Sequence, residues 1–277
     1  MINIRQGIIS GYALKARWRK TVWKIIATTG ALIMLIAVLS FYGQSVGSFV
    51  ITMDKQDYQR GLALSVTEDF SEPVLRLTAD PLKKATDCEI GWIPSDEEIS
   101  KDLGVKNGYK KNELGQTTDN EIYFAYTFLL KNVGKQKSDY VMRINLEQVT
   151  KSLDSILRIK VIDQYPNGEV TSKVYAKARE DKGYEGEPEE IYTEDKDPDN
   201  FDGYKSIGQT TPFVSDNIIA YETIKDLRVN QVHRYTVIMW LDGWDFQSDN
   251  SLLEGALKCS MDFYLATDVI IDDENSN

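Results

Sequence analysis

The chain has 277 residues, of which 43 are Asp or Glu and 32 are Lys or Arg, so its formal net charge is −11. An acidic surface repels the phosphates of nucleic acid, which excludes nucleic acid from the expected partners. The length is sufficient to bury one sizeable hydrophobic core, and we expect one folded domain.

The beginning of the chain is basic and then apolar. Residues 1–24 hold six Lys or Arg residues and no acid, and residues 25–42 form an uncharged, mainly apolar run. Eighteen helical residues at about 1.5 Å each span about 27 Å, close to the ~30 Å hydrocarbon core of a bilayer. We therefore expect a transmembrane helix over residues 25–42, with residues 1–24 in the cytoplasm and the rest of the chain outside it.

The same segment also fits a cleavable secretory signal peptide, which would make the protein a secreted one. Ser45-Val46-Gly47 offers small residues for cleavage, but no Ala-x-Ala stands there and the apolar run exceeds the usual ~7–15 residues. An uncleaved signal anchor is therefore the favoured interpretation. No lipobox Cys lies near position 45, and no second hydrophobic segment follows, which excludes a multi-pass channel or transporter.

Apolar and polar residues alternate through much of residues 47–266, as is typical of half-buried strands. The expected strands lie at residues 49–53, 62–66, 75–77, 124–130, 140–147, 157–161, 170–175, 218–224, 235–241 and 257–265. Short strands without long amphipathic helices between them indicate antiparallel pairing in a jelly-roll-like β-sandwich. The predicted fold is therefore all-β, an antiparallel β-sandwich over residues 47–266 preceded by one transmembrane helix.

The segments between the strands carry weaker signals. Asn167-Gly168 is typical of a tight hairpin, because both residues readily adopt positive φ. Residues 94–120 are polar and do not alternate, which predicts a long insertion loop with a short helix at residues 95–103. Residues 267–277 form an acidic tail.

After residue 53 the chain carries 26 bases against 43 acids, a net charge of −17, which suits a soluble extracytoplasmic domain or one that collects cations.

Two cysteines and one histidine limit the possible chemistry. Cys88 and Cys259 are either disulfide-bonded or two unpaired small hydrophobic residues, and a bridge over so long a loop would stabilise the fold by about 4–5 kcal/mol. His233 lies in a strand, where a structural role is commoner than a Ser-His-Asp or Cys-His arrangement. No His-Glu-x-x-His motif and no phosphate-binding Gly-rich loop is present. We expect no catalytic residues, although a carboxylate-based hydrolase remains an alternative.

An acidic stretch from Glu180 ends in alternating aspartates, Asp195, Asp197, Asp199 and Asp202. Alternating carboxylates on a loop can converge on a hard cation such as Ca²⁺. The spacing departs from an EF-hand, because Asn200 stands where the turn Gly belongs and Ser206 where the bidentate Glu belongs. A solvated acidic loop is the favoured interpretation, and a Ca²⁺-dependent ligand-binding domain is the alternative.

A Trp-Leu-Asp-Gly-Trp-Asp motif occupies residues 240–245. In the structural interpretation Trp240 packs in the core, Gly243 turns the chain and Asp242 or Asp245 caps the turn. In the functional interpretation Trp244 and Asp245 form a platform for a ligand such as a sugar. Trp244 follows the strand and is the better candidate for exposure.

Two stretches carry a resemblance to a known family: this motif before a closing strand, and the central strand Phe-Ala-Tyr-Thr-Phe-Leu-Leu-Lys-Asn at residues 124–132. Through both, residues 47–265 resemble an uncharacterised family of N-terminally anchored Gram-positive proteins. The resemblance implies an extracytoplasmic β-sandwich and brings no assigned activity. A basic, hydrophobic leader before a jelly roll is also distantly similar to biofilm-fibre and camelysin-like proteins, although no peptidase motif carries over.

We therefore expect a membrane-anchored or secreted cell-surface module with a structural or interaction role. Its N-terminus is expected in the cytoplasm and its C-terminal domain outside. The expected partners are the membrane, through residues 25–42, and another protein or further copies of the chain. We expect no catalysis and no cofactor, and Ca²⁺ binding is the alternative.

Overall fold

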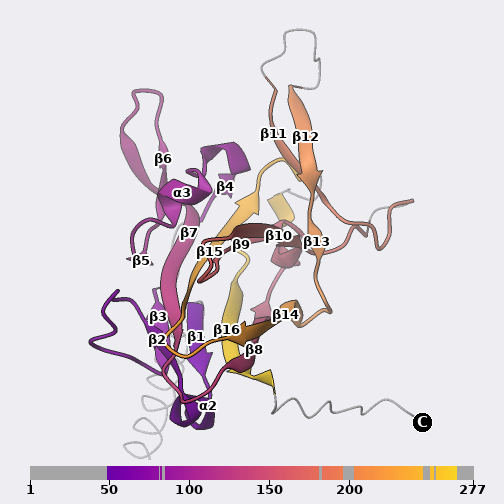
Figure 1. The fold of residues 1–277 in the computed structure, drawn as a ribbon. Helices are drawn as coiled ribbons and strands as arrows, with labels where there is room; N and C mark the ends of the chain where they lie inside the picture. The colour runs from indigo at the N-terminus through magenta and orange to yellow at the C-terminus, as the bar shows by residue number, and fades with distance from the viewer. Residues whose placement is uncertain are drawn as a thin grey trace, which may run out of the picture. The chain divides into compact units, whose positions relative to one another are not determined.

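A computed structural model describes residues 49–80, 82, 85–180, 183–195, 203–245, 250–252 and 254–266 (Figure 1). All of them belong to the second of two compact units, residues 47–277. The predicted segments 1–24, 25–42 and 267–277 lie outside the described residues. None of the helices within the described ranges is long and apolar enough to cross a membrane.

The unit is mostly β-structure, and its first sheet has five strands. Their order is β14 (Ile218–Leu227), β8 (Ser138–Val149), β16 (Leu257–Leu265), β1 (Phe49–Met53) and β3 (Arg76–Ala79). A short helix, α2 (Lys55–Arg60), follows β1.

The second sheet has nine strands, and a separate hairpin completes the β-structure. Its main path is β13 (Thr211–Pro212), β10 (Val170–Ala176), β9 (Leu157–Gln164), β15 (Val232–Asp242), β7 (Thr117–Asn132) and β2 (Leu62–Ser65). Three short strands lie beside this path: β4 (Asp87–Cys88) on β15, and β5 (Gly104–Val105) and β6 (Gly108–Lys111) on β7. The hairpin pairs β11 (Glu190–Glu194) with β12 (Tyr204–Gln209), and Figure 1 shows it extending beyond the larger sheets.

The inward faces of the two large sheets share one hydrophobic core, as the alternating sequence predicts. Fully buried members come from both sheets: Ile51, Met142, Ile144, Met261 and Phe263 from the first, and Phe128, Leu130, Ile159, Val161 and Val237 from the second. Burying each such side chain stabilises the fold by about 1.5–3 kcal/mol. The predicted Asn167-Gly168 hairpin is also present. Gly168 has a φ of 87° and lies in the turn that joins β9 to β10.

The prediction of purely antiparallel pairing is wrong for three pairs of strands. β1 runs parallel to β16, β4 parallel to β15, and β13 parallel to β10. Alternation shows which face of a strand is buried but carries no information about its neighbour. The long connections between these partners leave either direction open.

The predicted insertion loop at residues 94–120 is largely ordered, and the preceding chain packs with it on the outer face of the nine-stranded sheet. Its helix is shorter than expected, α3 (Asp96–Ile99), and is preceded by the 3-10 helix η1 (Ile90–Trp92). A second hydrophobic core lies here, with Cys88, Ile99, Tyr123, Ile238 and Trp240 buried. The sequence pattern missed the pairing of β5 and β6 with β7, because these strands are short and do not alternate.

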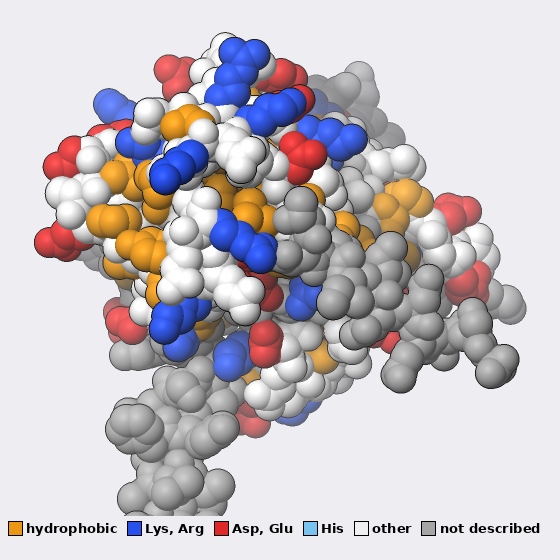
Figure 2. Space-filling model, turned by 60° about the horizontal axis from the view of Figure 1, so that its bottom comes forward, with side chains coloured by type: hydrophobic (Ala, Val, Ile, Leu, Met, Phe, Trp, Pro, Cys, Tyr) orange, Lys and Arg blue, Asp and Glu red, His pale blue; other side chains and the backbone are white. Residues whose placement is uncertain are grey.

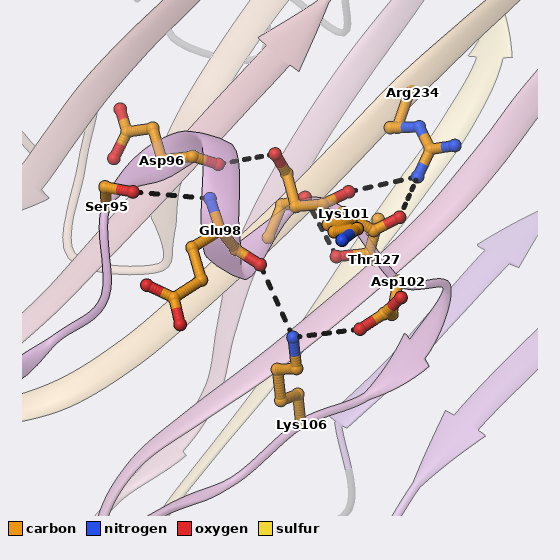
Figure 3. Close-up of polar contacts among 10 residues, drawn as sticks. Ser95, Asp96, Glu98, Lys101, Asp102, Lys106, Thr127 and Arg234 are labelled. Atoms are coloured by element: carbon orange, nitrogen blue, oxygen red, sulfur yellow. Dashed lines mark hydrogen bonds and ion pairs between the residues drawn. The ribbon is translucent and has the colours of Figure 1, made fainter.

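Arg234 fastens this layer to the sheet (Figure 3). Its Nη1 donates to the carbonyls of Ser100 and Lys101, at 3.0 and 3.2 Å, just after α3. Ser95 caps the helix by accepting from the Glu98 amide at 3.3 Å, and Lys106 donates to the Glu98 carbonyl at 3.4 Å. Arg234 therefore holds the loop after α3, and Ser95 and Lys106 hold the helix itself.

Candidate functional site

The Trp-Leu-Asp-Gly-Trp-Asp motif forms the end of β15 and the turn that follows. Trp240 is buried in the second core, and Leu241 and Asp242 pair with β4. Asp242 Oδ1 accepts from the Trp244 amide at 3.1 Å, so Asp242 caps the turn as the structural interpretation predicts.

A buried arginine forms ion pairs with two aspartates of this turn. The Arg158 Nη2 atom lies 2.6 Å from Asp245 Oδ2, and its Nε atom lies 3.3 Å from Asp242 Oδ2. All three side chains are at most 6% exposed. Burial raises the pKa of Asp242, and the Arg158 charge opposes that rise. The carboxylate of Asp245, predicted as part of a ligand platform, therefore lies against Arg158 instead of facing solvent.

Sequence reasoning missed Arg158, because it occupies a polar position of the alternating series Leu157-x-Ile159-x-Val161, which predicts a solvent-facing side chain. An arginine is rarely buried without an acidic partner. The two aspartates of the Trp-Leu-Asp-Gly-Trp-Asp motif are those partners.

Three aromatic rings lie close together at this turn. The Trp244 ring centroid is 5.4 Å from that of Tyr204, which is 5.2 Å from that of Tyr192. The Trp244 Nε1 atom donates to Glu89 Oε2 at 3.0 Å. All three residues are half-buried, so each keeps some surface open to solvent. We call Trp244, Tyr204 and Tyr192 the aromatic end.

The same region exposes a further tryptophan. Trp92, in η1 directly after Glu89, is 44% exposed, and the Lys110 ammonium lies 5.6 Å from its ring centroid. Exposed aromatic side chains with polar edges are typical of binding surfaces. The aromatic end is therefore the candidate binding site.

The predicted cation ligands lie mainly outside the described residues. Only Asp195 is described, and its amide donates to the Gly203 carbonyl at 3.0 Å where β11 and β12 meet. Its carboxylate lies 3.8 Å from Lys205 Nζ. Asp197, Asp199 and Asp202 are outside the described ranges, within which no group of three or more His, Cys, Asp or Glu side chains could hold a metal ion.

Both cysteines are free thiols, so the bridged alternative is wrong. Cys88 lies in the core outside the nine-stranded sheet, whereas Cys259 lies in the core between the two sheets. The second sheet separates them, which no local sequence pattern could reveal. Burial raises the pKa of each thiol to about 12, so neither is a nucleophile.

His233 is completely buried and belongs to a polar cluster between the sheets. Its Nδ1 atom is hydrogen-bonded to the Tyr140 hydroxyl, which is 2.7 Å from the Tyr235 hydroxyl. Its Nε2 atom faces Asp163 Oδ1 across 4.0 Å, and neither atom has a hydrogen-bond partner among the described residues. Burial lowers the pKa of His233 to about 3 and raises that of Asp163 to about 7.

This cluster resembles catalytic machinery only in its residue types. A general base must lie within hydrogen-bond reach of the proton that it removes from a substrate. No part of the His233 side chain is exposed, and its low pKa keeps the ring neutral at physiological pH. The geometry favours a structural role, in which the hydroxyls of Tyr235 and Tyr140 and the imidazole form a chain of hydrogen bonds.

No protein-family model matches the chain, and no curated protein is significantly similar to it. Among the sites described above, the aromatic end is the one with side chains partly open to solvent.

Proposed function

We propose that the protein is a non-catalytic interaction module of the cell surface. In this proposal residues 25–42 anchor it in the membrane, or direct its secretion if they are removed, and a jelly-roll-like β-sandwich works outside the cytoplasm. The resemblance of residues 240–245 and 124–132 to N-terminally anchored proteins supports this placement.

The observation that carries the proposal is the construction of the aromatic end. Trp and Tyr side chains contribute most of the binding energy at many protein interfaces, especially where they are held rigid before binding. Arg158, Asp242 and Asp245 hold the Trp244 turn, and Glu89 fixes the edge of the indole ring. The proposed partner is a protein at the cell surface, either a different one or a second copy of this chain.

The burial of the side chains best suited to catalysis supports a binding role over a catalytic one. His233, Cys88 and Cys259 are the side chains best suited to base or nucleophilic catalysis, and all three are at most 3% exposed. Each has its pKa shifted by burial away from the range useful for catalysis near neutral pH.

Site-specific photo-crosslinking in the cells that make the protein tests this proposal. A photoreactive phenylalanine analogue replaces Tyr204 in the full chain, and the matched control places it at Tyr184, an exposed tyrosine outside the aromatic end. We expect a discrete crosslinked species from position 204 and none from position 184, and Trp244→Ala should weaken it. A doubled mass would identify self-assembly, and another mass a different protein.

Equal crosslinking from the two positions, or none from position 204, would contradict the proposal. A crosslink that persists unchanged in the Trp244→Ala variant would remove the aromatic end from the interface.

A further inference from the structure

One face of the β11–β12 hairpin carries carboxylates beside its tyrosines. Side chains alternate along β11, so Glu190, Tyr192 and Glu194 point to the same face. Glu194 lies directly opposite Tyr204 in β12, which places Tyr204 on that face as well. The shift in register between the strands comes from one extra residue in β12, Ile207, and leaves this alternation along β11 in place.

Two of these carboxylates are within reach of a partner. Burial, together with the charge and the hydrogen bond of Glu190, raises the pKa of Tyr192, so Glu190 lies against that ring. Glu194 is exposed, and neither glutamate forms an ion pair within the described part of the chain. A third carboxylate, Glu89, is nearly buried and accepts from Trp244. Glu190 and Glu194 are therefore the acidic groups that the aromatic end offers.

Two basic side chains lie near this face, and both have partners. Lys205 points to the opposite face of β12, where its Nζ atom lies 3.8 Å from Asp195 Oδ1. Arg179, whose charge opposes the pKa rise of Tyr192, lies with its Cζ atom 3.9 Å from the Tyr184 ring centroid. By contrast, Figure 2 brings the α2 end forward and shows basic side chains interspersed with acidic ones on that side. The aromatic face of the hairpin therefore keeps its negative charge.

Aromatic rings and carboxylates together favour a cationic ligand. An ammonium or guanidinium group pairs with a carboxylate and is also attracted to the face of an aromatic ring. The chain makes the same ring contact elsewhere, because Arg179 lies over Tyr184 and the Lys110 ammonium lies 5.6 Å from the Trp92 ring centroid. An acidic ligand would be repelled by the two carboxylates.

The same charge disfavours contact between the aromatic ends of two copies of this chain. Such a contact would bring Glu190 and Glu194 against the same carboxylates of the other copy. After residue 53 the chain has 26 bases against 43 acids, a net charge of −17, which adds to the repulsion. The occupant that fits the charge is therefore a basic segment of a different protein.

On the basis of the function proposed above, we propose that the aromatic end binds a Lys- or Arg-rich segment of a different protein. The cationic groups of this segment pair with Glu190 and Glu194 and lie over the rings of Tyr192 and Tyr204.

Crosslinking at two salt concentrations tests this inference, with the photoreactive phenylalanine analogue at position 204 and unfractionated lysates of the cells that make the protein. Raising NaCl from about 0.1 M to about 1 M shortens the Debye length from about 10 Å to about 3 Å. We expect the yield of the crosslinked species to fall at least about threefold. Millimolar octalysine should lower the yield by competing for the site, whereas octaglutamate should not. These comparisons do not depend on any charge variant folding.

Charge variants then locate the interaction. Glu190→Gln combined with Glu194→Gln should lower the yield at the lower salt concentration at least about threefold. Glu72→Gln removes an exposed charge outside the aromatic end and should leave the yield unchanged. Mass spectrometry of the crosslinked species should identify a different protein, with Lys or Arg residues in the crosslinked segment.

The outcomes separate this inference from the proposed function. A yield that is unchanged by salt or by the double variant overturns the inference and leaves the proposed function standing, and so does a doubled mass. The absence of any crosslink from position 204 contradicts the proposed function itself, and this inference with it.

Discussion

Burial shifts the pKa values of Asp163 and His233 in opposite directions. Asp163 has its pKa raised from 3.8 to about 7, so the native state binds more protons than the unfolded state between these values. Its contribution to stability therefore falls as the pH rises from about 4 to 7. His233 has its pKa lowered from 6.5 to about 3, so its contribution is lost as the pH falls below 6.5. Between pH 4 and 6.5 the two slopes oppose each other.

Asp163→Asn should therefore stabilise the protein at alkaline pH. Above pH 7 the native carboxylate is ionised in a buried site, and the amide removes that charge without breaking a hydrogen bond at Oδ1, which has no partner among the described residues. We expect a gain of at least about 1 kcal/mol at pH 8, or about 2–4 °C in the unfolding midpoint, and a smaller gain at pH 4. Thermal unfolding of both proteins at the two pH values checks this. A gain that is independent of pH would rule out the ionised carboxylate as its source.

Arg158→Met should destabilise the protein by about 3–5 kcal/mol, because it leaves Asp242 and Asp245 buried without their cation. Urea denaturation followed by tryptophan fluorescence measures the loss. Arg228→Met removes an exposed arginine and serves as the control, with an expected change within about 0.5 kcal/mol. Equal effects of the two substitutions would show that the burial of Asp242 and Asp245 does not require the Arg158 charge.

Among the elements, α3 depends on a contact from a distant strand. Arg234 is the donor that joins the Ser100 and Lys101 carbonyls to β15. Arg234→Gln should therefore increase amide hydrogen exchange within residues 96–106 and leave β8 and β16 unchanged, because those strands lie in the other sheet. Exchange measured by mass spectrometry resolves these segments, and Arg228→Gln is the control. Faster exchange throughout the domain would indicate global destabilisation instead of local release.

How far the sequence predicts an element depends on its periodicity. Residues 257–265 alternate without interruption, and the predicted strand matches β16 in both bounds. Residues 94–120 do not alternate. They are held by the pairing of β5 and β6 with β7, which follows them directly in the chain, and by the Arg234 contact from the distant strand β15. The proximity of Asp163 to His233 could likewise not be predicted, because the two residues lie in different strands and only the strand register brings them together.

The two cysteines report whether both hydrophobic cores are intact. Each lies in a different core, and both are at most 3% exposed. We expect no reaction of the native protein with an aromatic disulfide reagent and two reactive thiols after unfolding in guanidinium. A thiol that reacts under native conditions would show that its core opens. A count below two after unfolding without reductant would show that the cysteines are oxidised.

The parallel pairing of β1 with β16 has a consequence for how the domain folds. Thr52 and Asp262, which are hydrogen-bonded across this pair, are 210 residues apart in the chain. Closing so large a loop costs entropy before any contact compensates for it, and such distant pairings slow folding. Synthesis proceeds from the N-terminus, so β1 and β8 both wait for the strand that lies between them. The five-stranded sheet is therefore completed only after residues 257–265 have been made and are free to pair.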